Sequence, residues 1–306
     1  MVALRRVGLD QEWYDVSHLP SRAAHPQRGD GAALALSVIV SLSYFEDVPP
    51  EGSVRPLDLS GGLSRMSVPP QYAQLSCREY GLRVGFFRLV RALESVGITP
   101  AIAIDVMTAE EYPFLVEYCL EHKYELVAHG ISATQPITSA MSLDTERHYL
   151  ADCLRRFQYA TGQIPSGWFG ASWSESERTP ALLRELGLRY LCDWPNDEQP
   201  YLMTGAAKGL VSLPMMFEFD DNYSFVIRDQ SVTEYAIALA RGAERLIKEG
   251  EAAPRFLGLS LSSWISGQGW RVGAIAKALG MIAANPKVVV SSPGEVATWT
   301  VSETNA

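Results

Sequence analysis

The residues best suited to chemistry follow short apolar stretches of this chain. His129, one of five histidines, comes directly after Glu125-Leu-Val-Ala128 and just before a polar loop over 130–136. In α/β folds with parallel strands, reactive groups collect at the carboxyl ends of the strands. Acidic, hydroxyl and aromatic residues stand at the ends of the other expected strands. They are Glu46 and Asp47, Asp105, Trp168, Asp193 and Trp194, Glu218 with Asp220 and Asp221, and Ser262, Ser263 and Trp264.

This set of side chains combines carboxylates, an imidazole and aromatic rings with little basic charge. It suits a small polar substrate held between aromatic walls, where carboxylate and imidazole transfer protons. Several members also have a purely structural interpretation. Glu46 could cap a helix, and Trp168 and Trp264 could pack in the core. We expect Asp220 and Asp221 to be solvated turn residues.

Other kinds of chemistry lack their motifs. The chain has no GxxxxGK[ST] phosphate loop and no G-x-S-x-G nucleophile elbow. Its four cysteines lie far apart without a CxxC pair, which is typical of reduced, buried thiols. With 26 basic and 35 acidic residues the net charge is −9. No nucleic-acid partner is therefore expected, because nucleic-acid binding needs a basic surface.

The apolar pattern predicts a cytoplasmic protein without a membrane partner. The N-terminal residues contain no sustained apolar stretch before a cleavage site, so no signal peptide is expected. The longest apolar run, over 32–42, contains two serines and is too short to span a bilayer.

Apolar runs and helical patterns alternate along the chain. Continuous apolar runs are typical of buried parallel strands, and apolar residues at helical spacing indicate amphipathic helices. Strands are expected over 33–44, 101–106, 124–128, 167–170, 190–193, 210–214, 255–261 and 287–291, and helices over 80–96, 109–121, 143–161, 179–186, 232–249, 271–284 and from 293 onward. We predict one α/β domain over 1–306, with a parallel sheet of about seven strands and an irregular arm over 1–30. Periodicity alone leaves closure into a barrel open.

Several segments, taken together, resemble the polysaccharide deacetylase superfamily, and within it the branch of allantoinase-type and cyclic imide hydrolases. They follow the family order and lie within residues 33–300: 43–47, 79–85 (which begins with Glu79), 125–130, 167–168, 190–200, and 264–268 with Arg271. The resemblance implies a distorted (β/α) barrel and hydrolysis of a C–N amide bond.

The chain departs from the family pattern at three positions. Family deacetylases end the first strand with two adjacent acids, a base and a metal ligand, where this chain has Phe45 and Glu46. Metal-binding members carry a second histidine four residues after the first, where this chain has Ala133. The histidine that usually precedes the Trp-Ile-Ser-Gly-Gln segment is replaced by Ser262, which could donate a hydrogen bond to a developing oxyanion.

These departures leave Glu46 and His129 as the only remaining metal ligands. A catalytic zinc site generally uses three protein ligands, so we expect no cofactor, with weak divalent metal binding as the open alternative.

The predicted function is metal-independent hydrolysis of a small cyclic amide, imide or ureide. The residues expected to act are the catalytic Glu46, His129 and Ser262, and the substrate-binding Trp168, Trp264, Asp193 and Glu79. The alternatives are a relative that binds a ligand without hydrolysis, a lyase or isomerase that uses His129, and last a metal-dependent deacetylase. A homo-oligomer is expected, because the loop over 48–71 and the arm need a surface to pack against.

Overall fold

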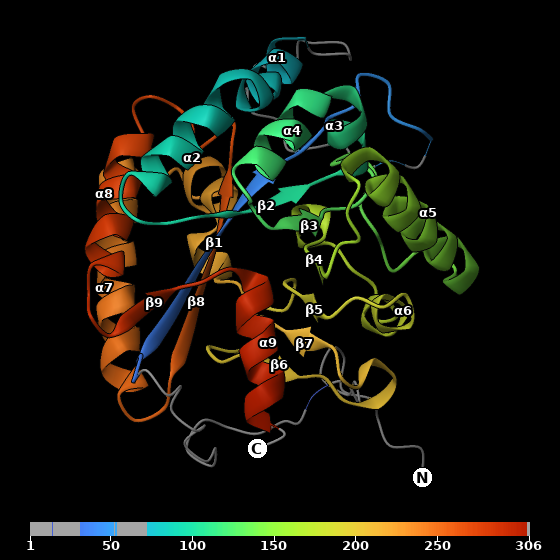
Figure 1. The fold of residues 1–306 in the computed structure, drawn as a ribbon. Coiled ribbons are helices and arrows are strands. Elements are labelled where there is room, and N and C mark those ends of the chain that lie inside the picture. Colours follow the sequence, from blue (N-terminus) through green and yellow to red (C-terminus); the bar gives the residue numbers. More distant parts are fainter. Residues whose placement is uncertain (1–13, 15–30, 52, 54–71, 305–306) are drawn as a thin grey trace.

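The chain folds around one curled, mostly parallel sheet with helices on its outer side (Figure 1). A computed structural model describes Tyr14 and residues 31–51, 53 and 72–304, so most of the expected arm and of the loop over 48–71 lies outside the described residues. Within the described part, the sheet has nine strands: β1 (Leu34–Leu42), β2 (Ala101–Ile104), β3 (Leu126–Ala128), β4 (Gly167–Trp168), β5 (Tyr190–Leu191), β6 (Tyr201–Leu202), β7 (Val211–Ser212), β8 (Arg255–Ser262) and β9 (Val288–Val290).

The strand order is β6-β7-β5-β4-β3-β2-β1-β8, and β9 pairs with the beginning of β1. Among the described strands, every pairing is parallel except that of β6 with β7. An isolated parallel bridge joins Met215, just after β7, to Gly258 in β8, so the segment after β7 closes onto the last strand of this order. The expected α/β fold, a distorted (β/α) barrel, is confirmed. Strand β6, which pairs antiparallel with β7, was not predicted.

Strands β1 and β8, paired at one end of the strand order, are the two longest strands of the sheet. All eight residues of β8 and eight of nine in β1 are buried, as expected for strands covered on both faces. Their parallel register pairs Ile39 with Ser260 and Ser41 with Ser262. The carboxyl ends of these two strands therefore present neighbouring serines at one end of the barrel.

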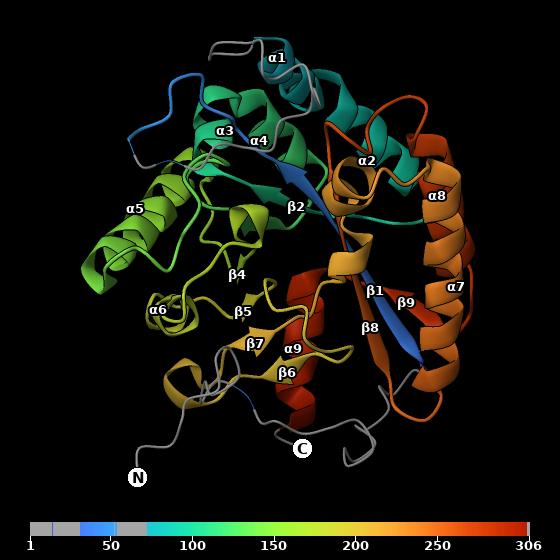
Figure 2. The same ribbon diagram turned by 180° about the vertical axis from the view of Figure 1, so that it is seen from behind.

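Helices surround the sheet. Helices α7 and α8 lie side by side on one side of the molecule, whereas α5 and α6 lie on the opposite side (Figures 1 and 2). The α-helices are α1 (Tyr72–Tyr80), α2 (Phe86–Glu94), α3 (Val106–Glu111), α4 (Pro113–Glu121), α5 (Leu143–Thr161), α6 (Thr179–Glu185), α7 (Val232–Gly250), α8 (Val272–Ala283) and α9 (Pro293–Thr304). Shorter helical turns are η3 (Gly81–Gly85), η4 (Ala171–Trp173), η5 (Gly205–Ala207), η6 (Phe217–Phe219) and η7 (Tyr223–Ile227). None of the helices in the described residues is long and apolar enough to cross a membrane.

Two expected helices are divided in the structure. The pattern over 80–96 predicted one helix, but the helical segment begins at Tyr72 and passes through the π-helical turn η3. The helix expected over 109–121 is two helices that meet at Tyr112, because Asp105 caps an earlier helix and Pro113 starts a new one.

Glycines allow η3 to pack directly on the turn that follows β8. A Cβ at Gly81 would lie 2.6 Å from the Ser263 hydroxyl oxygen and the Trp264 amide nitrogen. A Cβ at Gly85 would lie 2.1 Å from the Ser263 carbonyl oxygen. The glycines of the 79–85 segment therefore let helical backbone approach the chain that carries Ser262 and Trp264.

Gly85→Ala is expected to lower the free energy of unfolding by about 1–3 kcal/mol, because the backbone must shift to admit the methyl group. A matched control is Gly273→Ala in α8, where a Cβ meets nothing within 4 Å. That change should be neutral or stabilising by up to about 1 kcal/mol, since alanine favours helix. Urea unfolding measures both variants, and a Gly85→Ala protein as stable as the wild type would contradict the close contact.

Candidate functional site

A pocket of about 410 Å³ opens at the carboxyl ends of the parallel strands β1, β3, β4 and β8. Its walls come from the ends of β1 and β8, from the residues that follow β3 and β4, and from α1 and the segment over 217–227. The lining residues are Ser41, Ser43, Phe45, Arg78, His129, Ala133, Phe169, Ala171, Ser172, Trp173, Phe217, Asp220, Asn222, Tyr223, Ile227, Ser260, Ser262 and Trp264.

His129 lies in this pocket as a neutral imidazole. Its side chain is almost fully buried, and Nδ1 makes a hydrogen bond with the carbonyl oxygen of Phe169. Burial lowers the pKa of His129 to about 4, although the bond to Phe169 opposes this shift. A carbonyl only accepts, so Nδ1 carries the proton and Nε2 has the free lone pair. His129 can therefore accept a proton or a hydrogen bond from a molecule in the pocket.

Glu46 faces the loop that follows β3. Its carboxylate accepts hydrogen bonds from the hydroxyls of Ser132 (2.7 Å) and Thr134 and from the side-chain amide of Gln135 (2.9 and 3.1 Å). Glu46 is not among the residues that line the pocket. The structure thus makes Glu46 the anchor of the loop over 130–135, which begins directly after His129.

Hydroxyl groups form one side of the pocket. Ser41 and Ser43 come from β1 and its end, and Ser260 and Ser262 from β8. Because Ser41 pairs with Ser262 in the parallel register, these hydroxyls stand on neighbouring strands. Each hydroxyl can both donate and accept a hydrogen bond, so this side suits carbonyl and N–H groups of a ligand.

Aromatic rings and one guanidinium form the other walls. Trp264 belongs to this wall, as expected, together with Phe45, Phe169, Trp173, Phe217 and Tyr223. Arg78, in α1, is buried, and its guanidinium carbon lies 4.3 Å from the centre of the Phe45 ring and 5.9 Å from that of Trp264. Sequence reasoning missed Arg78 because the helix was expected to begin after it. Phe45, which stands where family deacetylases have an acid, stabilises the Arg78 guanidinium through this cation–π contact.

Trp173 is held in the wall by an unusual backbone. Both Ser172 (φ 58°) and Trp173 (φ 60°) adopt the left-handed conformation, which disfavours residues other than glycine. The indole N–H of Trp173 donates to the carboxylate of Asp220 at 3.3 Å. This arrangement places the Trp173 ring edge-on to Phe169 and to Phe217.

Three predicted substrate-binding residues do not line the pocket. The side chain of Trp168 is in the hydrophobic core, one residue before Phe169. Asp193 accepts hydrogen bonds from the Gly170 amide at 2.8 and 3.1 Å, next to Glu175, and burial raises the pKa of Asp193 to about 7. Glu79 is half-buried in α1, beside Arg78. The structure brings His129, Ser262 and Trp264 together, while Asp193 braces the segment that carries Phe169.

The expectation that Asp220 and Asp221 are solvated was wrong. Both residues are buried, and Asp220 lines the pocket. The carboxylate of Asp220 also accepts from the Tyr223 amide at 3.0 Å, and burial raises its pKa above the ordinary value. Two adjacent aspartates between apolar residues have the composition of a turn, and sequence alone gives no sign that η6, just before them, packs against β8 and η7.

The side chains present do not fit the three-ligand zinc site of metal-dependent deacetylases. Ala133 lines the pocket where those proteins have a second histidine, and the Glu46 carboxylate is already hydrogen-bonded to the loop. Among the described residues, no three His, Cys, Asp or Glu side chains form a group that could hold a metal ion. His129 is the remaining nitrogen ligand of that pattern.

Solved structures share this fold over almost its full length. Comparison with protein-family models and with curated proteins gives no match. The crystal structure of Puue allantoinase matches with a TM-score of 0.81 and 21% identity, over 93% of this chain and 96% of the other. A structure described as a probable polysaccharide deacetylase from Pseudomonas aeruginosa PAO1 matches with a TM-score of 0.78 and 21% identity, over 91% and 94%. The chain therefore has the same fold as these two proteins, and its sequence motifs resemble the polysaccharide deacetylase superfamily.

Proposed function

We propose that this protein hydrolyses a C–N bond in a small cyclic amide, imide or ureide without a bound metal ion. The observation that carries the proposal is a neutral, buried His129 in a pocket that combines a row of serine hydroxyls with aromatic walls. A planar ring can stack between the aromatic walls, and its alternating carbonyl and N–H groups can pair with the hydroxyls. The shared fold with an allantoinase supports the same class of substrate.

In this mechanism His129 is the general base, and Arg78 stabilises the negative charge of the transition state. The free Nε2 of His129 accepts the proton of a water molecule as its oxygen attacks the ring carbonyl carbon. With a pKa of about 4, His129 is a weak base that releases this proton readily. The negative charge that develops on the carbonyl oxygen is stabilised by Arg78 and by hydroxyl donors in the pocket. The C–N bond then breaks, the nitrogen takes a proton, and the ring opens to a carboxylate.

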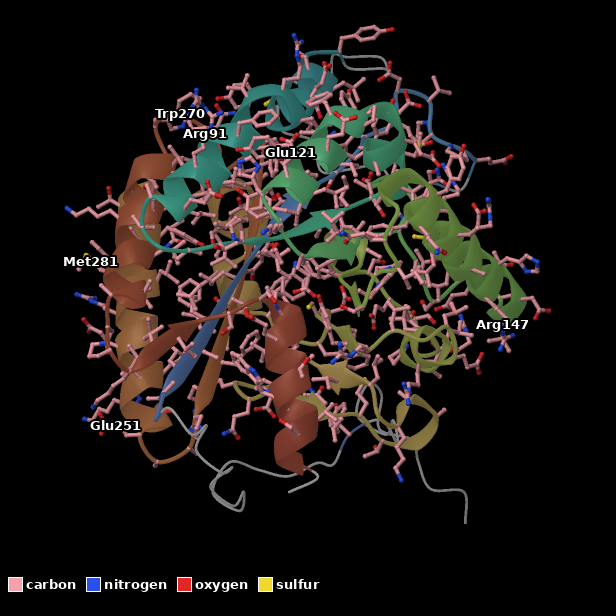
Figure 3. The ribbon with its side chains drawn as sticks, viewed as in Figure 1. Arg91, Glu121, Arg147, Glu251, Trp270 and Met281 are labelled. Atoms are coloured by element: carbon pink, nitrogen blue, oxygen red, sulfur yellow. The ribbon has the colours of Figure 1, made fainter. Side chains whose placement is uncertain are left out.

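Arg78→Met is expected to lower kcat/KM by about 10²-fold, because the change removes a charge at the developing oxyanion and keeps most of the side-chain length. Arg91→Met is the matched control. Arg91 is exposed at the periphery of α2 (Figure 3), and its replacement should leave turnover unchanged. Steady-state kinetics on a hydrolysed substrate checks both variants. Equal kcat/KM for Arg78→Met and wild type would remove Arg78 from the mechanism.

A ligand-binding protein without turnover is the second candidate function. The observation that favours it is the use of Glu46, four residues after β1, as a loop anchor outside the pocket lining. Such a protein would bind the same planar rings and leave them intact.

One experiment separates these functions. The purified protein is incubated with cyclic imides, ureides and amides and with acetylated sugars, in EDTA and in added zinc, and both ring opening and binding heat are measured. Ring opening that persists in EDTA supports the proposal. Binding without ring opening supports the binding protein, and zinc-dependent acetate release would refute metal-independent hydrolysis.

A further inference from the structure

The lining of the candidate pocket changes from polar to apolar between its buried floor and its mouth. Its buried members are mostly polar or charged: Ser41, Arg78, His129, Asp220, Ser260 and Ser262, with Phe169 and Ala171. The most exposed apolar members are Phe217, which is 37% exposed, and Ile227, which is 55% exposed. The groups that can pair with a ring amide therefore lie inside, and apolar surface borders the opening.

Phe217, Tyr223 and Ile227 together form what we call the 217–227 rim. The ring centroids of Phe217 and Tyr223 lie 4.6 Å apart. Tyr223 and Ile227 are four residues apart in η7, a spacing that places side chains on the same helical face. Single exposed apolar residues are normal on a protein surface, but a contiguous apolar patch beside a pocket is typical of a binding surface.

The arginine next to this rim is already paired with a carboxylate. Arg228 follows Ile227, and its guanidinium carbon lies 4.4 Å from the centre of the Tyr223 ring. The same guanidinium donates to both carboxylate oxygens of Glu218, at 2.5 and 3.2 Å. A ligand group that lies on the 217–227 rim therefore gains from apolar contact and not from an ion pair with Arg228.

The volume of the pocket leaves room for a group of this kind. A pocket of about 410 Å³ falls within the range of about 300–1,000 Å³ that is typical of sites for drug-sized ligands. A bare five- or six-membered ring is much smaller than such a ligand. When the ring amide meets His129 and the serine hydroxyls, the remaining volume extends toward the rim.

We propose that the substrate ring carries an uncharged apolar substituent, an alkyl or aryl group, and that the 217–227 rim binds this substituent. The ring lies against His129 and the serine hydroxyls, and the substituent extends out of the pocket across Phe217, Tyr223 and Ile227. The rim determines specificity and takes no part in bond breaking. This inference rests on the proposed binding of cyclic amides, imides or ureides and narrows that substrate class.

Hydantoins test the proposal, because they are cyclic ureides that can carry different groups on C5. Wild-type kcat/KM should rise about 3-fold from hydrogen to methyl at C5, and at least about 30-fold from hydrogen to benzyl, because the substituent loses apolar surface to the rim. A carboxymethyl group should give no gain over hydrogen, since its charge would leave water for an apolar surface.

Ile227→Ser should lower the benzyl-over-hydrogen ratio of kcat/KM by about 3- to 10-fold, because serine offers less apolar surface. Phe217→Ser should lower the same ratio from the other side of the rim. Ile227→Phe should raise the ratio about 2-fold, a gain that mere loss of stability could not produce. The matched control is Ile237→Ser: Ile237 is 48% exposed on α7 and does not line the pocket, so the wild-type ratio should persist.

Binding heat measured in the His129→Ala background separates this inference from the proposed hydrolysis. That variant leaves the rim intact, and its Kd for the benzyl compound should be at least about 30-fold lower than for unsubstituted hydantoin. Should wild type open none of the rings while this difference in Kd persists, hydrolysis fails and the rim assignment stands. Absent or equal binding across the series would overturn the assignment. So would a preference for the carboxymethyl compound, or a benzyl preference that Ile227→Ser and Phe217→Ser leave unchanged.

Discussion

His129→Ala is expected to lower kcat/KM by about 10²- to 10⁴-fold, the usual contribution of a positioned acid–base group. The imidazole is buried, neutral and fixed by its bond to Phe169, so Nε2 meets the attacking water in one orientation. Alanine removes that acceptor and leaves the walls of the pocket in place. Steady-state kinetics on a substrate that the wild type opens measures the effect.

His148→Ala is the matched control for this prediction. His148 also has its Nδ1 on a backbone carbonyl, that of Asp144 at 3.0 Å, but it is exposed on α5. This control should keep full activity. If His129→Ala turns over substrate at the wild-type rate, the acid–base role is lost, and retained ligand affinity in that variant would show that the pocket itself survived.

Glu146→Ala is expected to lower the free energy of unfolding by about 3 kcal/mol, near the lower end of the range for breaking a buried ion pair. Glu146 is fully buried in α5, and its carboxylate accepts hydrogen bonds from the hydroxyls of Ser176 and Thr179 at 2.6 Å and from Arg178 Nε at 3.1 Å. Alanine would leave these donors without their acceptor. The cost stays near the lower end because the Arg178 side chain is 25% exposed and can reach water.

Urea unfolding of Glu146→Ala is best compared with Glu110→Ala. Glu110 also pairs with an arginine, Arg156 at 2.6 Å, but both side chains are about one-third exposed, so its loss should cost less than about 1 kcal/mol. Equal stability losses in the two variants would contradict the special role of burial at Glu146. Glu146 accepts a hydrogen bond from Ser176, three residues after Trp173. Its loss should therefore also make the backbone that follows Trp173 less ordered.

Local signals predicted the main elements well. Helix α5 has the predicted bounds of 143–161, because Ser142 caps its first turn and Gly162, with φ 70°, ends it. Strands β1 and β8 were recognised from continuous apolar runs. The division of the helix over 80–96 was not predictable, since it depends on contact between Gly85 and Ser263, which are far apart in sequence.

Proximity to a strand end predicted part of the candidate site. It indicated His129, Ser262 and Trp264, which all line the pocket. The position of a residue after a strand does not determine where its side chain points. Glu46 turns to the 130–135 loop, and Arg78 enters from a helix with no strand-end signal. The homo-oligomer, the small-molecule partner and the absence of a cofactor stay predictions.

The left-handed backbone at Ser172 and Trp173 has a consequence for ligand affinity. Two successive non-glycine residues in this conformation raise the free energy of the folded chain by about 1–3 kcal/mol each. The rest of the fold offsets that cost before any ligand arrives, and the Trp173 ring is already ordered against Phe169 and Phe217. A ligand therefore loses little affinity to the ordering of this wall, and the pocket is preorganised for a flat ring.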